Sequence, residues 1–408
     1  MTSTKNYFFI IFLLSSFLIN AQQKETNSFS VKWNNGLKIE SADKQFKLKM
    51  GGRIMVDFAT FSQDNNLDVA FNPLTTTSGS ELRRARIFTS GTLYENIDFK
   101  FSIEFSGNKS IIKDAYIGIK EIPFFGNIRV GHVKEPMRLK DLTSSKYMTF
   151  MERSFASDFM QQRNNGIVFF NDYFDKKISV QAGYFLNEDN SSDDKASNGG
   201  YAVTSRVTSL LLNNKEKRQL LHVGLAYSYR EPSSKEYKVE SRPEAHLSRL
   251  KYIFTGPISG VKNINITNFE TAFVKGPFSV QAEYLTSNVH TGISNPIETY
   301  KFSTYYGEVS YFITGENRVF KNSYNGFDRV KPTNNFGKNG AGAWEVAMRY
   351  SYSDLNSKDI FGGEQADITL GVNWYLNPSV RFMANTVFAD IKNKGKASIF
   401  QARFQIDF

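Results

Sequence analysis

The 408-residue chain contains no cysteine and only four histidines. The absence of cysteine excludes a disulfide-stapled scaffold and any metal site built on thiolate ligands. The histidines, at positions 132, 222, 246 and 290, are scattered, and none lies four residues from another as in a helical zinc motif. We therefore expect neither a metal site nor a cofactor.

Long apolar runs are also missing beyond the first residues of the chain. The only run, Tyr7 to Ile19, has 13 residues and follows the positively charged Lys5. A membrane-spanning helix needs ~20 apolar residues, so this segment is too short to cross a bilayer. The small residue Ala21 and the polar residues after it fit a secretory signal better than an N-terminal anchor. Residues 1–21 are predicted to be a signal peptide, with the mature chain beginning near Gln22.

Aromatic residues are abundant, yet they do not cluster into apolar elements. They make up 15% of the chain, with 37 Phe and 20 Tyr, while the mean hydropathy is only −0.39. They alternate with polar residues, most clearly in the terminal segment 400–408, FQARFQIDF. Such alternation in segments of ~10 residues is typical of outer-membrane barrels, whose strands face lipid and lumen in turn. A soluble sandwich is the alternative, but the export signal and the number of segments argue against it.

Residues 22–45 are predicted to be a short periplasmic segment and residues 46–408 the barrel. We expect about sixteen strands near 46–58, 82–93, 99–106, 111–121, 127–134, 165–173, 177–186, 199–211, 219–230, 263–274, 277–288, 303–314, 342–354, 366–376, 379–391 and 397–408. The number is even, as bacterial single-chain barrels require. The predicted fold is all-β, a transmembrane antiparallel β-barrel whose long polar loops, such as 187–198, face outward. The segments 231–262 and 316–340 do not fit this scheme and stay without a place.

The segment 136–165 is the third extracellular connection and has no sustained strand or helix period. Loops of this length within an ordered domain are uncommon and usually functional. Its basic residues alternate with Met137, Tyr147, Phe150, Phe155 and Phe159. Apolar residues at this density need a surface to pack against. We therefore expect the loop to fold into the barrel and to constrict it.

The faces opposite the bulky apolar residues carry more basic than acidic residues. On the second strand, for example, Arg84 and Arg86 are expected in the lumen and Arg83 on the other face. Rings of Arg and Lys select anions and phosphate, and a guanidinium can grip either phosphate or carboxylate with two hydrogen bonds. The residues predicted to line the lumen and its constriction are Arg84, Arg86, Lys100, Arg129, Arg138, Lys140, Lys146, Arg153 and Arg163.

A lumen without ion preference is an open alternative, because basic and acidic side chains can pair across any porin. Within the constriction loop, acidic residues partly offset the basic ones; they are Glu135, Asp141, Glu152 and Asp158.

Several collinear motifs resemble the phosphate-selective porin O/P family. They include LRRARI at 82–87, SGTLYE at 90–95, KDAYIG at 113–118, RVGHVKEP at 129–136, FMERS at 150–154, RPE at 242–244, GPFS at 276–279, TGENR at 314–318, GAWE at 342–345 and GVNWYL at 371–376. The resemblance implies a sixteen-stranded trimeric porin of the bacterial outer membrane, constricted by its third loop. It further implies small anions such as phosphate as solutes, and lipid and lipopolysaccharide as surroundings.

Two other classes of function are weighed against a porin. An enzyme is not expected, since no G-x-S-x-G, H-E-x-x-H or Gly-rich phosphate-binding motif occurs. A non-conducting barrel acting as a surface scaffold or adhesin is the other alternative. The net charge of +10 does not indicate nucleic acid, because no compact basic stripe with stacking aromatics is present.

Overall fold

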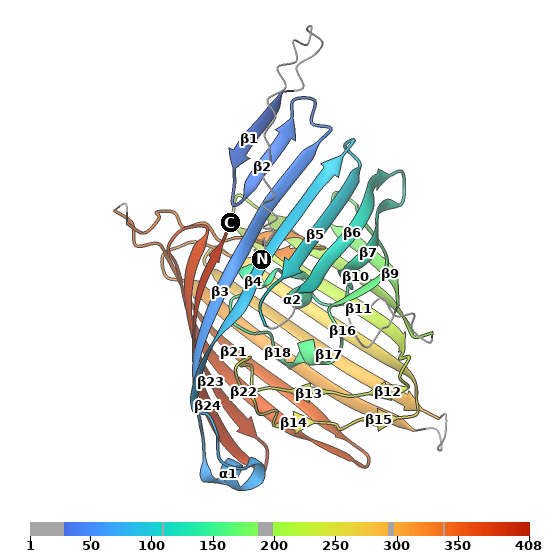
Figure 1. Ribbon diagram of the computed structural model, residues 1–408, viewed down its shortest axis with the longest axis vertical. Coiled ribbons are helices and arrows are strands. Elements are labelled where there is room, and N and C mark those ends of the chain that lie inside the picture. The colour runs from blue at the N-terminus through green and yellow to red at the C-terminus, as the bar shows by residue number, and fades with distance from the viewer. Residues whose placement is uncertain (1–27, 108–109, 187–198, 293–297, 338) are drawn as a thin grey trace, which may run out of the picture.

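The computed structural model describes residues 28–107, 110–186, 199–292, 298–337 and 339–408 (Figure 1). The signal peptide predicted for residues 1–21 and the outward loop predicted for residues 187–198 lie outside these ranges. In the described part of the chain, no helix has both the length and the apolar character needed to cross a membrane.

Sixteen antiparallel strands form a closed barrel, in which β24 pairs with β3 through partners such as Arg403 and Asp57. The barrel strands are β3 (Lys47–Gln63), β4 (Ser78–Leu93), β5 (Ile97–Glu104), β6 (Ile111–Ile122), β7 (Gly126–Lys134), β8 (Arg163–Tyr173), β9 (Ile178–Leu186), β10 (Tyr201–Asn214), β11 (Gln219–Glu231), β16 (Val261–Lys275), β17 (Phe278–Thr291), β18 (Thr299–Phe312), β21 (Ala343–Ser357), β22 (Ile360–Tyr375), β23 (Val380–Ile391) and β24 (Gly395–Asp407). Each overlaps one segment predicted from alternation, so the predicted fold class is confirmed.

The two-residue period separates lumen from lipid in the way the sequence predicts. On β24, the side chains of Arg403 and Gln405 face inward and are each 2% exposed, whereas Phe400 and Phe404 face outward and are 50% and 40% exposed. Closing the barrel pairs every strand on both edges, so no unpaired backbone edge is left facing hydrocarbon.

A two-stranded hairpin continues the wall at the end of the barrel that holds the C-terminus (Figure 1). Its strands are β1 (Phe29–Trp33) and β2 (Leu37–Ser41). The first part of β3 pairs with β2, and the later part of the same edge pairs with β24. Phe408 sits at this junction beside Gly51, where an added Cβ would lie 2.3 Å from the Phe408 carbonyl oxygen. The segment predicted as a short periplasmic segment, residues 22–45, thus contains a β-hairpin that extends the barrel wall.

The connections at the two ends of the barrel differ in length, which assigns the sides of the membrane. Short turns such as 94–96, 123–125 and 276–277 lie at the end that holds the C-terminus, which we assign to the periplasm. The opposite, extracellular end carries residues 64–77 with α1 (Asn65–Phe71).

Three longer connections contain further elements. The constriction loop (residues 135–162) contains α2 (Leu139–Leu142), η1 (Ser145–Tyr147) and η2 (Phe155–Asp158). The outer loop (residues 232–260) contains β12 (Glu236–Tyr237), β13 (Glu240–Ser241), β14 (Ile253–Phe254) and β15 (Ile258–Ser259). The periplasmic segment (residues 313–342) contains β19 (Phe320–Asn322) and β20 (Gly326–Phe327). The outer loop and the periplasmic segment correspond to the two stretches, 231–262 and 316–340, that the alternation pattern left unassigned.

Candidate functional site

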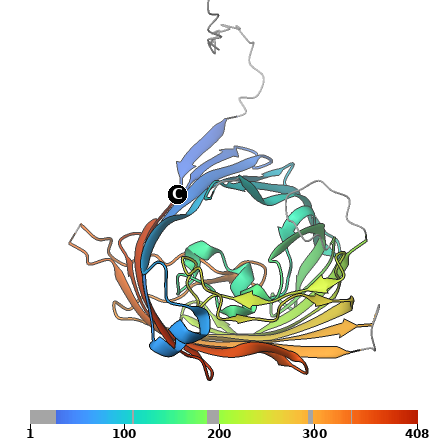
Figure 2. The same ribbon diagram turned by 60° about the horizontal axis from the view of Figure 1, so that its bottom comes forward.

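The constriction loop lies inside the barrel, where its helical turns cross the lumen (Figure 2). Its backbone is held by inward-facing side chains of distant strands. The Met151 N–H donates to Asn385 Oδ1 at 2.8 Å, and the Leu139 N–H donates to Glu270 Oε2 at 2.7 Å. Phe150 is fully buried. The loop therefore packs against the wall formed by β16 to β24 and fills that half of the lumen.

Two of the predicted pore residues, Arg138 and Lys140, anchor the loop to this wall. The Lys140 ammonium donates to Glu308 Oε1 at 2.7 Å, and Arg138 pairs with Asp141 at 2.7 Å and with Glu283 at 3.8 Å. Both cations are at most 1% exposed.

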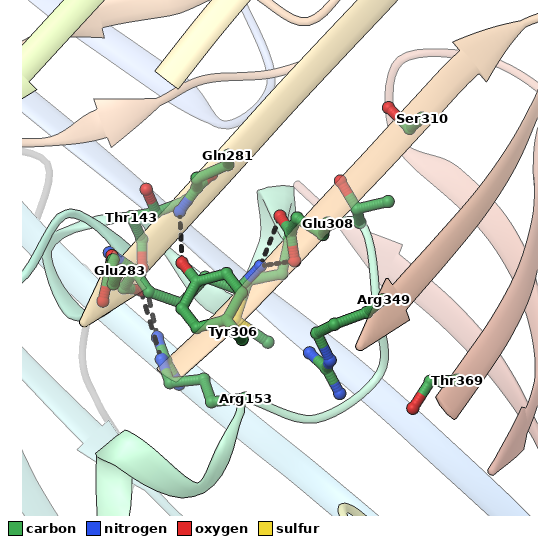
Figure 3. Close-up of polar contacts among 12 residues, drawn as sticks. Thr143, Arg153, Gln281, Glu283, Tyr306, Glu308, Ser310, Arg349 and Thr369 are labelled. Carbon is green, nitrogen blue, oxygen red and sulfur yellow. Dashed lines mark hydrogen bonds and ion pairs between the residues drawn. The ribbon is translucent and has the colours of Figure 1, made fainter. Parts of the chain in front are cut away.

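The same wall supports this contact with further polar groups. Beside Glu308, the Gln281 amide donates to the Tyr306 hydroxyl at 2.8 Å (Figure 3). The expectation that Arg138 and Lys140 line the channel is therefore corrected, because the acidic wall captures both charges in buried pairs.

The opposite half of the lumen holds an open cavity of about 440 Å³ between the constriction loop and the wall formed by β3 to β8. Eleven Lys and Arg residues line this cavity, against two Asp residues, 114 and 328. The basic residues are Lys49, Arg53, Arg84, Arg86, Lys100, Arg129, Lys134, Lys146, Arg153, Arg163 and Lys321. The loop thus packs against the wall that carries Glu270, Glu283 and Glu308, and it leaves the basic wall facing the passage.

Some of these cations are balanced by carboxylates of the barrel wall. Arg86 pairs with Glu104 at 2.9 Å, Lys100 and Arg163 share Asp114 at 2.9 and 3.0 Å, and Arg129 pairs with Asp98 at 3.0 Å. Arg84 lies 3.7 Å from Glu104. The Arg129 guanidinium is also held 4.6 Å from the ring centres of both Tyr116 and Phe170.

Four other cavity residues form no ion pair within the described ranges: Lys49, Arg53, Lys134 and Lys321. Lys134 instead donates to the carbonyls of Asp141 and Leu142 at 2.6 and 2.8 Å, and Arg53 donates to Ser145 Oγ at 2.7 Å. No neighbouring carboxylate in the described ranges therefore pairs with these four residues.

Lys146 and Arg153 of the constriction loop also reach the cavity. Arg153 donates to the carbonyls of Lys140 and Thr143 at 3.2 and 3.1 Å, which fixes the loop backbone around it. Burial lowers the pKa of Arg153 to about 10 and that of Lys146 to about 8, although Asp407 opposes the shift of Lys146. Lys146 is thus a cavity charge that titrates close to neutral pH.

A β-bulge corrects the expected orientation of Arg83. The pairing of β3 with β4 shifts between Met55 and Val56, so that Arg83 is an extra residue on β4. A bulge leaves two neighbouring residues opposite one and can turn both to the same face. Arg83 therefore points inward like Arg84, and its Nε donates to Glu152 Oε1 of the constriction loop at 2.9 Å. A second shift, at Ser102 on β5, likewise brings Lys113 into the lumen.

The periplasmic segment enters the barrel from the other side and meets the constriction loop. Arg206 donates to the Ser323 carbonyl at 2.9 Å, and the Tyr324 hydroxyl donates to Asp172 at 2.6 Å. The Phe327 N–H donates to Thr143 Oγ1 at 3.3 Å. This insertion brings Lys321 to the cavity. The only signal in the sequence was the length of the segment, which exceeds that of an ordinary periplasmic turn.

The basic surface continues on both sides of the constriction. A cavity of about 610 Å³ toward the outer loop shares Arg84, Arg86, Arg153 and Arg163 with the central one, and adds Arg242 and Lys251. A cavity of about 570 Å³ toward the periplasm shares Lys49 and Lys321 and adds Lys38, Arg218 and Lys331. Through these shared lining residues the three cavities form one basic path, although the outer cavity also has Glu152, Asp158, Glu240 and Glu244 in its wall.

The outer loop is fixed beside this path by its own polar contacts. Arg349 of β21 and Thr369 of β22 both donate to Glu244 Oε2, at 3.1 and 2.9 Å, and His246 Nδ1 lies 2.8 Å from Glu81 Oε1. Arg349 and Thr369 project from neighbouring strands (Figure 3). Among the described residues, no group of three or more His, Cys, Asp and Glu could hold a metal ion.

Comparisons with known proteins agree with this architecture. The sequence profile of the family described as "Phosphate-selective porin O and P" matches residues 48–408. Porin O of Pseudomonas aeruginosa is 26% identical over 398 residues, covering 88% of this chain and 86% of that protein.

Solved structures show the same fold at low sequence identity. The anion-selective porin from Comamonas acidovorans has a TM-score of 0.57 at 14% identity and covers 89% of this chain and 100% of its own. A trimer form of OmpT from Vibrio cholerae has a TM-score of 0.53 at 12% identity, covering 88% and 99%.

Proposed function

Because this chain belongs to the phosphate-selective porin O and P family, we propose that the channel it forms in the bacterial outer membrane favours anions, with phosphate as a solute. The observation that carries this proposal is the composition of the constriction, where eleven basic side chains line a cavity that has two acidic ones.

The electrostatic reason lies in the surroundings of the passage. A lumen walled by protein of low dielectric constant focuses the field of its charges and raises the local concentration of counter-ions. Lys49, Arg53 and Lys321 contribute most directly, because no carboxylate within ion-pair distance cancels their charge in the described chain. Chloride and phosphate should therefore enter more readily than potassium.

Transport further requires that each site release the ion it binds. Conduction is fast when binding is favourable enough for entry and weak enough for exit, with several sites in series. Arg86 and Arg163 already donate to Glu104 and Asp114. Part of their hydrogen-bonding capacity is therefore occupied, which keeps an anion from being trapped, while a dianionic phosphate can still contact several guanidinium groups in turn.

We also propose that the channel is a homotrimer without catalytic activity. The trimer proposal rests on family membership and on the trimer form of the OmpT neighbour. The outward faces of the strands, rich in exposed Phe, Tyr, Val and Leu, are suited to lipid. Exposed lysines at the extracellular rim, such as Lys358 and Lys396, are suited to the phosphates of lipopolysaccharide.

Ion selectivity is tested with purified protein in planar bilayers. A reversal potential measured under a KCl gradient should give a chloride permeability above that of potassium. Phosphate added to the KCl solution should reduce the chloride current, since both ions compete for the same basic path. A potassium preference would refute the anion proposal, and a chloride current insensitive to phosphate would refute phosphate binding.

A further inference from the structure

Asp367 on β22 differs from most buried carboxylates of the lumen in its lack of a cationic partner. It is fully buried and forms no ion pair among the described residues. Within the described residues, its side chain accepts one hydrogen bond, from the Gln365 amide to Asp367 Oδ1 at 2.8 Å. Glu270 and Glu308, by contrast, pair with Arg206 and Lys140. The charge of Asp367 therefore needs another source of compensation.

A second carboxylate lies close to Asp367. Glu244 of the outer loop accepts a hydrogen bond from Thr369, which stands two residues along β22 on the same inward face. Arg349 donates to the same oxygen, Glu244 Oε2. The other oxygen, Glu244 Oε1, is buried and has no hydrogen-bond partner among the residues that the structure describes. Arg349 balances one of the two carboxylates and leaves one negative charge.

Neutral oxygen atoms surround this pair. Ser351 stands opposite Asp367 in the pairing of β21 with β22, and Ser353 stands opposite Gln365. Residues opposite each other on one face have Cβ atoms ~5 Å apart. Five oxygens in this group are buried and have no hydrogen-bond partner in the described protein: Glu244 Oε1, Ser351 Oγ, Ser353 Oγ, Gln365 Oε1 and Asp367 Oδ2. All five residues are at most 5% exposed.

Such a concentration of unpartnered oxygens is costly unless something binds them. Buried polar groups in native proteins are nearly always hydrogen-bonded, and an unsatisfied one lowers stability. A buried negative charge without compensation costs considerably more. One cation would satisfy both requirements, because it contributes positive charge and accepts several oxygen ligands at once.

We propose that Asp367, Glu244, Gln365, Ser351 and Ser353 form a binding site for one calcium ion, which ties the outer loop to the β21–β22 wall. The donor set is all oxygen, which suits a hard cation. Ca²⁺ accepts 6–8 oxygens, including carboxylates, amide carbonyls and water, in flexible geometry, whereas Mg²⁺ demands a near-ideal octahedron. Water molecules would complete the coordination. Glu244 also lines the outer cavity of the basic path, whereas Asp367, Gln365 and the two serines line none of the three cavities. The calcium proposal does not rest on the anion preference of the channel.

The site also has a structural consequence for the outer loop. Glu244 belongs to this loop, while Asp367, Gln365 and the two serines belong to the barrel wall. Near the same wall, β14 of the loop lies against β22, with Ile253 and Leu355 buried in one apolar cluster. Calcium would therefore join the loop to the wall at a second point, beside this apolar contact.

Calcium binding can be measured on the full chain, purified in detergent and stripped with a chelator. Isothermal titration with CaCl2 should give one ion per chain, with a Kd of about 10⁻⁴–10⁻³ M as in other extracellular modules. Asp367→Asn keeps the shape of the side chain but removes its charge, and should weaken binding about tenfold or more. Asp390→Asn is the matched control, because Asp390 is an exposed residue of the neighbouring strand that pairs with Lys396 at 3.5 Å.

A second measurement, the midpoint of thermal unfolding, distinguishes a variant that has lost its calcium site from one that has failed to fold. Calcium should raise the midpoint of the wild-type protein and of Asp390→Asn, and should leave that of Asp367→Asn unchanged. Wild-type protein that binds no calcium would overturn the proposal and indicate a proton on Asp367. Equal calcium binding by wild type and Asp367→Asn would overturn it as well, since the ion would then sit elsewhere.

Discussion

Replacing Arg53 by Gln isolates the contribution of one unpaired charge to ion selection. Arg53 lies in the wall of the constriction cavity, donates to Ser145 Oγ at 2.7 Å and has no ion pair in the described chain. Its removal therefore leaves no carboxylate uncompensated. Removal of Arg86, by contrast, would leave Glu104 with only Arg84 at 3.7 Å as a cationic partner. The shorter Gln loses the Nη1 contact with Ser145, but the pairs of Lys140 with Glu308 and of Arg138 with Glu283 should keep the constriction loop in place.

The magnitude follows from the size of the cavity. A volume of about 440 Å³ corresponds to a sphere of roughly 5 Å radius, so a passing ion comes within about 5 Å of a wall charge. Coulomb's law then gives about 0.8 kcal/mol per unit charge with the dielectric constant of water, and about 3 kcal/mol at an effective value of 20. Anions lose this stabilisation and cations gain it. The chloride-to-potassium permeability ratio should therefore fall by about tenfold or more.

The assay is the reversal potential in a KCl gradient kept near 0.1 M, where the Debye length of ~10 Å leaves the interaction largely unscreened. The effect should shrink near 1 M, where the Debye length is ~3 Å. Lys396→Gln, which removes an exposed charge at the extracellular rim, serves as the control. A folded, conducting Arg53→Gln channel with the wild-type reversal potential at low salt would refute the electrostatic reasoning.

Three further perturbations separate the roles of the lumen segments. Lys140→Met removes the closer of two cations that pair with the buried Glu308, while Arg318 stays at 3.6 Å. It should lower the free energy of unfolding by up to about 3–5 kcal/mol, with much of the loss recovered in the double variant with Glu308→Gln, as measured by urea denaturation. Raising the pH from 7 to 9 should weaken anion preference, because Lys146 loses its proton as the pH passes its pKa of about 8; Lys146→Arg should abolish this dependence, and a persisting one would assign it to another group. Deleting residues 319–327 should raise the single-channel conductance, since it withdraws the periplasmic segment from the passage; an unchanged value would mean that the narrowest point lies elsewhere.

The barrel itself could be predicted from alternation because its physical cause is local. Each strand places successive side chains on opposite faces, and lipid on one side and water on the other impose opposite chemistries. β24 is the clearest case, with Phe400 and Phe404 outside and Arg403 inside. The match to the family profile and the similarity to Porin O confirm the predicted family, the outer-membrane location and the channel class.

The site could be predicted only in part, because its geometry depends on contacts distant in sequence. Within the constriction loop no period assigns a face, so Arg138 and Lys140 could not be told apart from Lys146 and Arg153. What distinguishes them is the acidic wall of Glu283 and Glu308, more than a hundred residues away in the chain. These residues belong to β17 and β18, and nothing in the loop sequence indicates which strands it will meet.

A β-bulge made the alternation pattern assign Arg83 to the wrong face of its strand. Arg83 was assigned to the outer face because a regular strand would place it there, but the extra residue of the bulge turns it inward. An arginine in contact with lipid is costly at mid-membrane depth, which was a signal that this position needed another explanation. The insertion of the periplasmic segment likewise rests on distant partners, such as Arg206 and Asp172.

The edge of β3 shared by β2 and β24 has a consequence for biogenesis. β2 can occupy the first part of that edge early in folding, since the two strands are close neighbours in the chain. The remainder is occupied by residues 397–407 of β24, which lie far from β3 in the chain. Pairing of β24 with β3 is thus the strand pairing with the largest entropic cost, because loop-closure entropy grows with the length of chain enclosed. A chain that lacks β24 cannot close this seam, so its barrel would keep an unpaired backbone edge in the membrane.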